Sequence, residues 1–357
     1  MKAKKILSSL LTTICFSFSA LAISSCGEVG SSEPISDSSD TNYQATEGLE
    51  YALSEDGNSY SITGITTTER DIVIPAIYNN KPVTSIAESA FWSCTFIRSI
   101  RVPDSVTSIG FEAFRECSGL QSITLPFIGE TLDGTENTHF GYIFGASHSY
   151  DNNSFIPTKL NEVTITKGKI IGVQAFYDCS SLTSIKIPNG VTEISWNAFR
   201  KCSSLTSFTI PDSVTSIGEY AFASCSLTSI TIPNSVTSID NNAFSGCGSL
   251  ESVKIGKGVT RLEGYTFAWC SSLTSITIPD NVTRIGERAF LDCTLLTSIT
   301  IPDSLISVDD SAFCYCSSLE TVYYTGTEEQ WNNINISWYC NEDFTGATIV
   351  YNYVPEE

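Results

Sequence analysis

Residues 205–225 of the chain read LTSFTIPDSVTSIGEYAFASC, and variants of this pattern fill most of its 357 residues. Leu205, Phe208 and Ile210 alternate with polar residues that favour extended backbone, which predicts a short β-strand. Pro211 ends this strand, because proline has no N–H to donate to a sheet ladder. The rest of the unit must therefore follow a different course.

The second half of the unit carries two further signals. Val214 and Ile217 begin a second, shorter extended segment. Phe222, preceded by alanine, lies three residues before Cys225, and one tight helical or 3₁₀ turn would place both side chains on one face. Each unit thus offers apolar side chains from three short segments.

The unit repeats nine times, and the period is 23 residues with a single step of 22 and one longer gap between Phe114 and Phe176. One unit cannot bury so many apolar side chains by itself, so neighbouring units must stack and share one continuous core. The expected structural ladder consists of Phe91, Cys94, Phe114, Cys117, Phe176, Cys179, Phe199, Cys202, Phe222, Cys225, Phe244, Cys247, Phe267, Cys270, Phe290, Cys293, Phe313 and Cys316.

The nine ladder cysteines invite a disulfide or zinc interpretation, which the repeat argues against. Stacked units would place them about 4.8 Å apart, but parallel side chains that point into one core lack the geometry of a disulfide. No paired CxxC spacing suggests zinc. We therefore predict buried free thiols that act as small apolar residues. Cys314 and Cys340 lie outside the ladder, and whether they pair stays open at this point.

The N-terminus has the pattern of an export signal. Lys2, Lys4 and Lys5 precede an apolar stretch over 6–23, and small residues follow. That order predicts a cleaved signal peptide over 1–25. The stretch contains several Ser and Thr residues, which makes it a poor membrane-spanning helix.

Once the signal is removed, the chain is strongly acidic. Three of its 19 basic residues leave with the signal, so 16 remain against 39 acidic ones, a net charge of −23. Such a polyanion repels phosphate backbones and anionic headgroups, so we expect no nucleic-acid partner and no direct membrane surface. Segment 26–46 is rich in Ser, Asp and Glu and reads as a flexible tether.

Catalytic motifs do not stand out. His139 and His148, the two histidines, both lie in one polar insertion, and the sequence has no nucleophile elbow, HExxH, P-loop or dinucleotide fingerprint. The residue after the repeat proline is Asp in some units and Asn in others, as in Asp212 and Asn234, which is typical of turns. We therefore expect no catalytic residue, no cofactor and no metal.

Two resemblances add to these inferences. The run ISSCG at 23–27 resembles the lipobox of bacterial lipoproteins, which implies acylation of Cys26 and membrane contact through that anchor alone. The repeat resembles the leucine-rich repeat of BspA-like surface proteins, whose pattern is LxxIxIPxxVxxIgxxAFxxCs, over about 72–324. This second resemblance implies a right-handed leucine-rich-repeat solenoid with a parallel β-sheet on one face and short extended segments and 3₁₀ or helical turns on the other.

The same resemblances imply an organisation and a role. The expected segments are the signal peptide 1–25, the lipidated cysteine with its tether 26–46, an N-terminal cap 47–82, repeats 83–324 and a C-terminal cap 325–357. The implied function is adhesion or protein recognition on the extracellular face of a bacterial envelope, with a protein or glycan of a host matrix or neighbouring cell as partner. The alternatives are a structural spacer or coat protein without a specific ligand, and a lattice-binding or ice-binding solenoid.

Positions that vary between units indicate where a partner could bind. On the expected sheet, Ser and Thr flank the central apolar residue, with Arg101, Lys186 and Lys254 as cationic exceptions and Glu162 as the acidic one. Ser and Thr also simply suit an exposed sheet. Aromatic residues, which dominate interface energetics, stand at variable positions around the Ala-Phe turn: Trp92, Phe111, Tyr177, Trp196, Tyr220, Tyr265, Trp269 and Tyr315.

The insertion 127–159 replaces one regular step and is rich in aromatic residues. We expect these aromatic side chains to fold back onto the solenoid. Loops of this length often carry function, so the insertion is a second candidate region.

Overall fold

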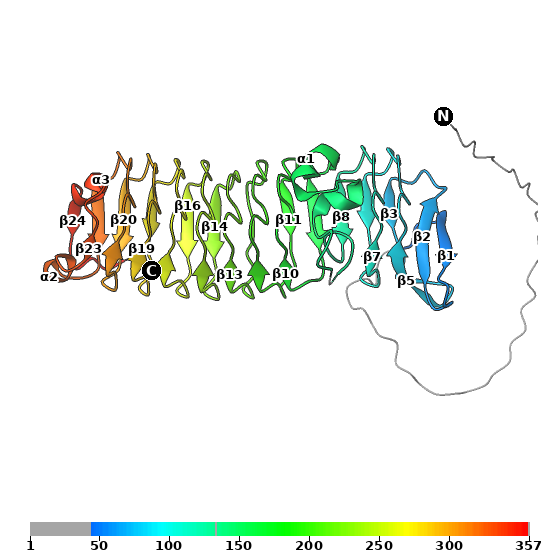
Figure 1. Ribbon diagram of the computed structural model, residues 1–357, viewed down its shortest axis with the longest axis horizontal. Coiled ribbons are helices and arrows are strands. Elements are labelled where there is room, and N and C mark those ends of the chain that lie inside the picture. Colours follow the sequence, from blue (N-terminus) through cyan, green and yellow to red (C-terminus); the bar gives the residue numbers. More distant parts are fainter. Residues whose placement is uncertain (1–43, 133, 356–357) are drawn as a thin grey trace, which may run out of the picture. The chain divides into compact units, whose positions relative to one another are not determined.

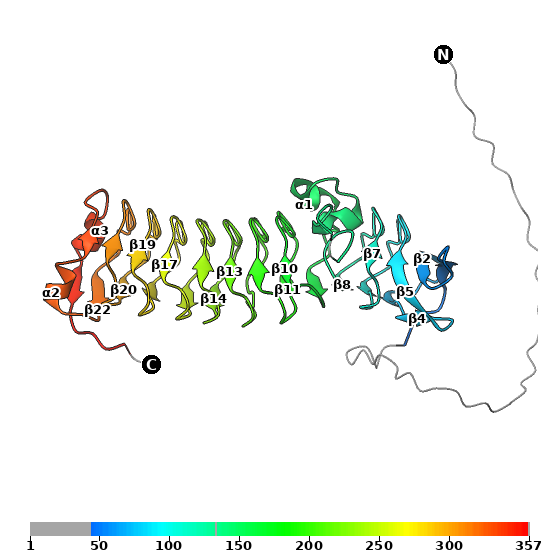
Figure 2. The ribbon, with the colours of Figure 1, turned by 60° about the horizontal axis from the view of Figure 1, so that its bottom comes forward.

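The computed structural model describes residues 44–132 and 134–355, all within one compact unit, Asn42–Glu357. The expected signal peptide, Cys26 and nearly all of the tether lie outside the described residues. The unit is an elongated parallel β-solenoid, in which each repeat forms one turn, called a coil below (Figure 1). Turning the view shows the coils stacked side by side along the long axis (Figure 2).

The first extended segments form a row of parallel, in-register strands, called the first sheet below, which strand pairing among the described residues divides into three parts. In β20 and β22, for example, Ser298 pairs with Thr321 and Ile299 with Val322. Side chains alternate between the core and solvent, as the period of two requires. Its strands are β3 (Asp71–Val73), β6 (Ser99–Arg101), β8 (Ser122–Leu125), β9 (Glu162–Ile165), β11 (Ser184–Lys186), β14 (Ser229–Ile232), β16 (Ser252–Ile255), β18 (Ser275–Thr277), β20 (Ser298–Ile301), β22 (Thr321–Tyr324) and β24 (Thr348–Val350).

The second extended segment builds a second row of short parallel strands, the second sheet, as the sequence predicts, although in the quoted unit the strand is confined to Ser216–Ile217 and Val214 lies before it. Threonine side chains strengthen the row, since Thr215 donates its hydroxyl to the carbonyl of Thr192 in the preceding coil at 3.1 Å. The strands are β5 (Lys81–Ile86), β7 (Ser108–Ile109), β10 (Ile170–Ile171), β12 (Glu193–Ile194), β13 (Ser216–Ile217), β15 (Ser238–Ile239), β17 (Arg261–Leu262), β19 (Arg284–Ile285), β21 (Ser307–Val308) and β23 (Asn335–Ile336).

The Ala-Phe segments form the third side, the turn face, and here the structure differs from the helical turn considered above. Every second residue donates its N–H to the next coil: Phe222 bonds the carbonyl of Ala243 at 2.8 Å. The residues in between donate their N–H groups within their own coil and so form tight turns. The N–H of Cys225, for example, donates to the Phe222 carbonyl at 3.2 Å. Tyr220 and Ser224 have left-handed backbone, with φ of 56° and 60°. Positive φ belongs to chained β-turns and not to a helix.

A column of stacked phenylalanine rings fills the core, as the repeat predicts. The rings of Phe222 and Phe244 lie 5.3 Å apart and nearly parallel, and all nine repeat phenylalanines are buried. The nine ladder cysteines are free; eight are buried and Cys94 is half-buried. Offset stacking of this kind adds to the energy of apolar burial.

The unit quoted at the outset is the one whose expected strand does not form. Residues 205–210 lack strand pairing with β11 or β14. Phe208 stands where neighbouring coils carry Ile185 and Ile230, and its ring packs against the Phe199 ring at 4.8 Å and the Phe222 ring at 5.1 Å. The larger side chain meets the core column, and the backbone around it leaves the ladder. The strand prediction for this coil is wrong for that reason.

The insertion completes a coil of its own. It contains η1 (Phe140–Phe144), η2 (Ser149–Asp151) and α1 (Asn152–Phe155). Phe140 and Phe144 are fully buried and carry the ring column from Phe114 to Phe176, with the Phe140 and Phe176 rings 5.2 Å apart. The predicted folding back of the aromatic side chains is thus confirmed for these rings, whereas Tyr150 and Phe155 are exposed.

The C-terminal segment forms a final, lengthened coil that closes the core. β23 and β24 continue the two sheets, and the Phe344 ring stacks on Phe313 at 4.3 Å. Two short helices belong to it, α2 (Glu328–Trp331) and α3 (Glu342–Thr345). Trp331 packs against the Phe344 ring at 5.5 Å and covers the end of the ring column.

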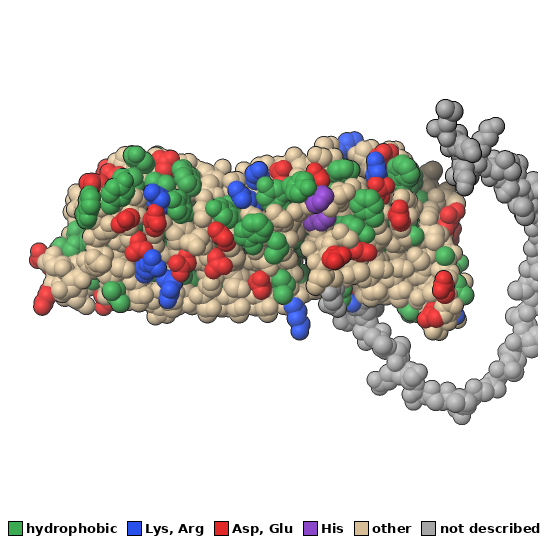
Figure 3. Space-filling view, in the orientation of Figure 1, with side chains coloured by type: hydrophobic (Ala, Val, Ile, Leu, Met, Phe, Trp, Pro, Cys, Tyr) green, Lys and Arg blue, Asp and Glu red, His purple; other side chains and the backbone are tan. Residues whose placement is uncertain are grey.

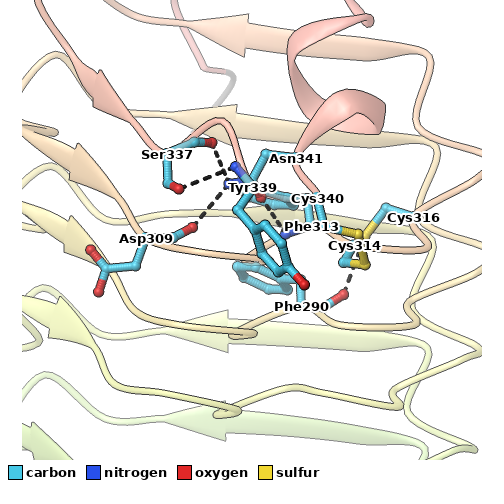
Figure 4. The surroundings of a disulfide bond; sticks show 9 residues. All are labelled: Phe290, Asp309, Phe313, Cys314, Cys316, Ser337, Tyr339, Cys340 and Asn341. Carbon is cyan, nitrogen blue, oxygen red and sulfur yellow. Dashed lines mark hydrogen bonds between the residues drawn. A yellow bond between two sulfur atoms is a disulfide. The ribbon is translucent and has the colours of Figure 1, made fainter.

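Cys314 and Cys340 form a disulfide that joins this final coil to the last regular one (Figure 4). Beside it, the buried Asn341 side chain accepts a hydrogen bond from the Phe313 N–H at 3.0 Å and donates to the carbonyls of Asp309 and Ser337. The pairing left open by the sequence is therefore settled, and the final coil is held by covalent and polar contacts.

The N-terminal end is closed by antiparallel strands. β1 (Leu49–Leu53) pairs with β2 (Tyr60–Ile65), which in turn pairs in parallel with β5. The short β4 (Ile77–Tyr78) pairs antiparallel with β5. The Tyr51 and Tyr78 rings stack at 3.6 Å over this end.

Candidate functional site

The aromatic candidates of the turn face differ in how far they are exposed. Trp92, Trp196 and Trp269 expose 53%, 43% and 43% of their surface, and Tyr315 exposes 65%. The others are half-buried and pack against neighbouring coils: Phe111, Tyr177, Tyr220 and Tyr265. The structure therefore keeps the tryptophans as candidates for contact and makes the half-buried rings partly structural.

Cations of adjacent coils cover several of these rings. The Arg200 guanidinium lies 4.6 Å from the centre of the Tyr220 ring, and Arg288 lies 5.4 Å from that of Tyr265. Two more pairs follow the same arrangement, Arg115 over Trp92 and Lys201 over Tyr177. Such contacts are favourable and occupy a ring face. Within residues 44–132 and 134–355, neither a cation nor another ring covers Trp196.

Trp196 lines a surface hollow of about 550 Å³, called the Trp196 groove below. Four successive coils line it, with the residues Val173, Glu193, Ser195, Trp196, Ser216, Gly218, Glu219 and Asp240. At Gly218, one of these lining residues, an added Cβ would come within 2.8 Å of the backbone of Ser195 and Trp196. The close approach of two coils thus requires glycine there.

Carboxylates dominate the polar lining of the groove. Glu193 accepts a hydrogen bond from the Ser195 hydroxyl at 2.7 Å, and Asp240 accepts one from Ser238 at 3.0 Å. The third carboxylate is Glu219. Figure 3 shows acidic side chains along the middle of the visible face and hydrophobic ones along its upper edge, most densely towards the C-terminal end.

A second hollow, of about 330 Å³, lies nearer the C-terminal end and differs in charge. Arg284 and Asp309 both line it, and the Arg284 Nε lies 2.9 Å from the Asp309 carboxylate in an ion pair between adjacent coils. This hollow therefore contains its own cation, whereas the Trp196 groove is lined by none.

The cationic candidates lie elsewhere. Arg101, Lys186 and Lys254 belong to β6, β11 and β16 of the first sheet, and both lysines are exposed. The structure does not bring them together with the Trp196 groove, which is built from the second sheet and the turn face. The first sheet also begins one strand earlier than expected, at β3, so Asp71 joins Glu162 as a carboxylate on this face.

The two histidines of the insertion lie in different environments. His139 is buried, its Nε2 lies 3.0 Å from the Ala146 carbonyl, and burial lowers its pKa. His148 stacks on the Tyr150 ring at 4.8 Å. Within residues 44–132 and 134–355, no group of three or more His, Cys, Asp and Glu side chains is placed to hold a metal ion. None of the described helices is long and apolar enough to cross a membrane.

The groove carboxylates were missed at the level of sequence, although a signal existed. Glu193, Glu219 and Asp240 occupy variable positions of the second extended segment and of the residues just after it. Comparing these positions between units, as was done for the first segment, would have shown the concentration of acid around Trp196. That the three residues come together depends on the stacking of coils.

Stacked short coils with buried Leu, Ile and Phe side chains define a leucine-rich-repeat solenoid. The chain belongs to the BspA-type leucine-rich-repeat family: the family described as "BspA type Leucine rich repeat region (6 copies)" matches residues 72–141, 148–227 and 215–342. No curated protein matches the chain.

Several solved bacterial structures are similar to the chain. A leucine-rich repeat protein of Bacteroides ovatus shares 23% identity, with 86% of this chain and 70% of that chain covered and a TM-score of 0.46. A leucine rich cell surface protein of Faecalibacterium prausnitzii shares 26% identity over 82% of this chain and 97% of that chain, with a TM-score of 0.38. The T. pallidum leucine rich repeat protein shares 25% identity over 71% and 91%, with a TM-score of 0.33.

Proposed function

We propose that the protein is a non-enzymatic binding protein of the bacterial cell surface, anchored by acylation of Cys26, which recognises a macromolecule through its solenoid. The partner is a protein or glycan of a host matrix or of neighbouring cells. Membership of the BspA-type family supports a role in surface interaction. The single observation that carries the proposal is Trp196, an exposed ring that no cation or ring of the described residues covers, beside a groove built from four coils.

The Cys314–Cys340 disulfide supports export. Disulfides form and persist in oxidising compartments outside the cytoplasm and are rare within it. The ladder thiols are compatible with such a compartment, because burial raises their pKa values and keeps them protonated, and the thiolate is the reactive form. A signal peptide at 1–25 would deliver the chain there.

Recognition should come from a patch spread over adjacent coils and not from one enclosed pocket. The buried faces of the coils are nearly invariant from unit to unit, whereas the residues around Trp196 differ. Aromatic residues in such patches contribute a large share of binding energy.

The test uses the domain 46–357, without signal and anchor, as bait for extracellular-matrix preparations and for neighbouring bacteria. Capture of a saturable partner by the wild-type domain, with loss on Trp196→Ser, is the expected result. Trp269→Ser is the comparison variant, since that residue is equally exposed but does not line the Trp196 groove. Equal loss in both variants, or none in either, would remove the Trp196 groove from the proposal.

The alternatives give different results in the same set of experiments. A spacer or coat protein would capture no partner in any preparation. A lattice-binding solenoid would show freezing hysteresis with the purified domain. The interruption of the first sheet around Phe208 speaks against the lattice alternative, because it breaks the regular Ser and Thr array that a lattice would need.

A further inference from the structure

We infer that the Trp196 groove receives arginine or lysine side chains from an extended, basic polypeptide segment of the partner. This inference rests on the proposed function and specifies the chemistry of its site. Three observations carry it. The groove carboxylates form no ion pair within the described residues, the second hollow holds an arginine at the equivalent position of the repeat, and no described cation or ring covers Trp196.

The groove combines three carboxylates with no basic side chain in its lining. Glu193, Glu219 and Asp240 come from successive coils. In the part of the chain that the structure describes, the ion pairs between side chains do not include these three residues. A concave surface of one sign concentrates the field and attracts groups of opposite charge.

The repeat itself shows which group fits such a place. Arg284 stands six residues before Phe290, and Asp309 four before the next repeat phenylalanine; the two form an ion pair across adjacent coils. In the Trp196 groove the same two positions hold Ser216 and Asp240. Asp240 thus has the position of Asp309 but lacks the guanidinium that its counterpart receives.

Trp196 offers the second half of a cation site. Four other rings of the turn face already hold an Arg or Lys from a neighbouring coil, Tyr220 with Arg200 among them. Tryptophan presents the most favourable ring face for a cation. An incoming guanidinium can therefore contact this ring and the adjacent carboxylates together.

The occupant is a polypeptide because the groove is open and crosses coils. A single exposed ion pair contributes little, so binding requires several cations held at once along the groove. An extended chain with repeated basic side chains meets that requirement, and arginine adds planar, bidentate contact with carboxylates.

The test introduces the missing cation into the groove by substitution of a lining residue. Ser216→Arg should place a guanidinium against Asp240, as Arg284 lies against Asp309, and the position accepts arginine in two other coils, Arg261 and Arg284. The control is Ser252→Arg, an exposed position of the first sheet that changes the net charge equally. The probe is a synthetic peptide of alternating arginine and serine, measured by calorimetry at physiological salt, with thermal unfolding of each variant recorded in parallel.

We expect Ser216→Arg to raise the Kd of the peptide about tenfold or more and Ser252→Arg to leave it nearly unchanged. At physiological salt, dissolved ions screen a surface charge that lies far from the binding site, so such a charge has little effect on affinity. Equal weakening by both variants would mean attraction to net charge alone and would overturn the inference. Spermine binding as tightly as the peptide would replace a polypeptide occupant by any linear polycation and would overturn it too.

The failure of this inference can be told from the failure of the proposed function. If the wild-type domain captures a partner from the extracellular preparations and Ser216→Arg captures it equally well, the function stands and the basic occupant is wrong. If the wild-type domain captures nothing, the function itself fails, whatever the peptide does.

Discussion

The thiol of Cys225 donates a hydrogen bond to the carbonyl oxygen of Phe199 in the preceding coil, with Sγ and O 3.1 Å apart. The same oxygen also accepts the N–H of Cys202 at 3.1 Å, so both of its acceptor sites are used. This arrangement recurs in most coils, from Cys117 with Phe91 to Cys316 with Phe290. It gives the repeated cysteine a physical reason: the side chain is small and apolar and still carries a weak donor.

The thiols should therefore resist reagents until the solenoid unfolds. In the native domain 46–357, a thiol reagent should label Cys94 first, because it is half-buried while the other eight are buried. In denaturant without reductant, nine thiols should react, and eleven after reduction of the disulfide. Fewer than five in the unreduced, unfolded protein would show that the ladder oxidises.

Alkaline pH should destabilise the solenoid. Burial raises the pKa of Cys117, Cys202, Cys247 and Cys293 to about 12, above that of an unfolded cysteine. A raised folded-state pKa means that the unfolded chain loses these protons first, so the stability is complete below pH of about 8.5 and falls as the pH rises towards 12. Denaturant unfolding between pH 8 and 11 measures this, and the variant Cys202→Ala with Cys247→Ala should show a shallower fall. An unchanged slope would assign the fall to other groups.

Core and surface aromatic residues should respond differently to truncation. Phe222→Ala empties a position in the ring column and should cost about 3–5 kcal/mol of stability. Replacing Trp196 and Tyr220 together by Ser should cost less and weaken partner binding by about 2 kcal/mol. Serine suits the left-handed backbone at position 220, since Ser89 and Ser311 adopt it there in other coils. Chemical denaturation and binding to the captured partner separate the two effects, and unfolding of the double variant as readily as Phe222→Ala would place both rings in the core.

The disulfide should stabilise the final coil more than the rest of the solenoid. It closes a segment with a sequence separation of 26, for which cross-linking contributes about 2–4 kcal/mol. Cys314→Ser with Cys340→Ser should therefore increase hydrogen exchange in β23 and β24 first. Exchange in β12 and β13 is the internal control, because each coil contacts only its nearest neighbours and these strands lie far from the disulfide. A uniform increase across all coils would contradict this.

The anchor can be tested independently of the solenoid. Cys26→Ala should release the protein from the membrane fraction and leave the thermal unfolding of the domain unchanged, because the proposed acylation site lies outside the repeats. Ser25→Ala is a neighbouring control that keeps the cysteine. Partition of the Cys26→Ala protein into detergent would show that the lipoprotein prediction is wrong.

The repeat made most of the fold predictable, because period, strand signals and the core column all follow from one unit. Three features did not follow. Phe208 looks like any apolar strand residue in the sequence, and only the ring column beside it makes its size matter. Cys314 and Cys340 come together through the fold of the last coil. The carboxylates around Trp196 meet through stacking, which is set by the three-dimensional register.

The left-handed residues of the turn face limit how this protein can change over evolution. Two positions in every regular coil, exemplified by Tyr220 and Ser224, require a positive φ, which β-branched residues adopt only at high cost. The position that Trp196 occupies in its coil does not require a positive φ, and the equivalent residue one coil earlier is Val173. New partners can therefore be acquired most freely through the residues at the Trp196 position of successive coils. The positive-φ positions accept fewer residue types, because valine, isoleucine and threonine are disfavoured there.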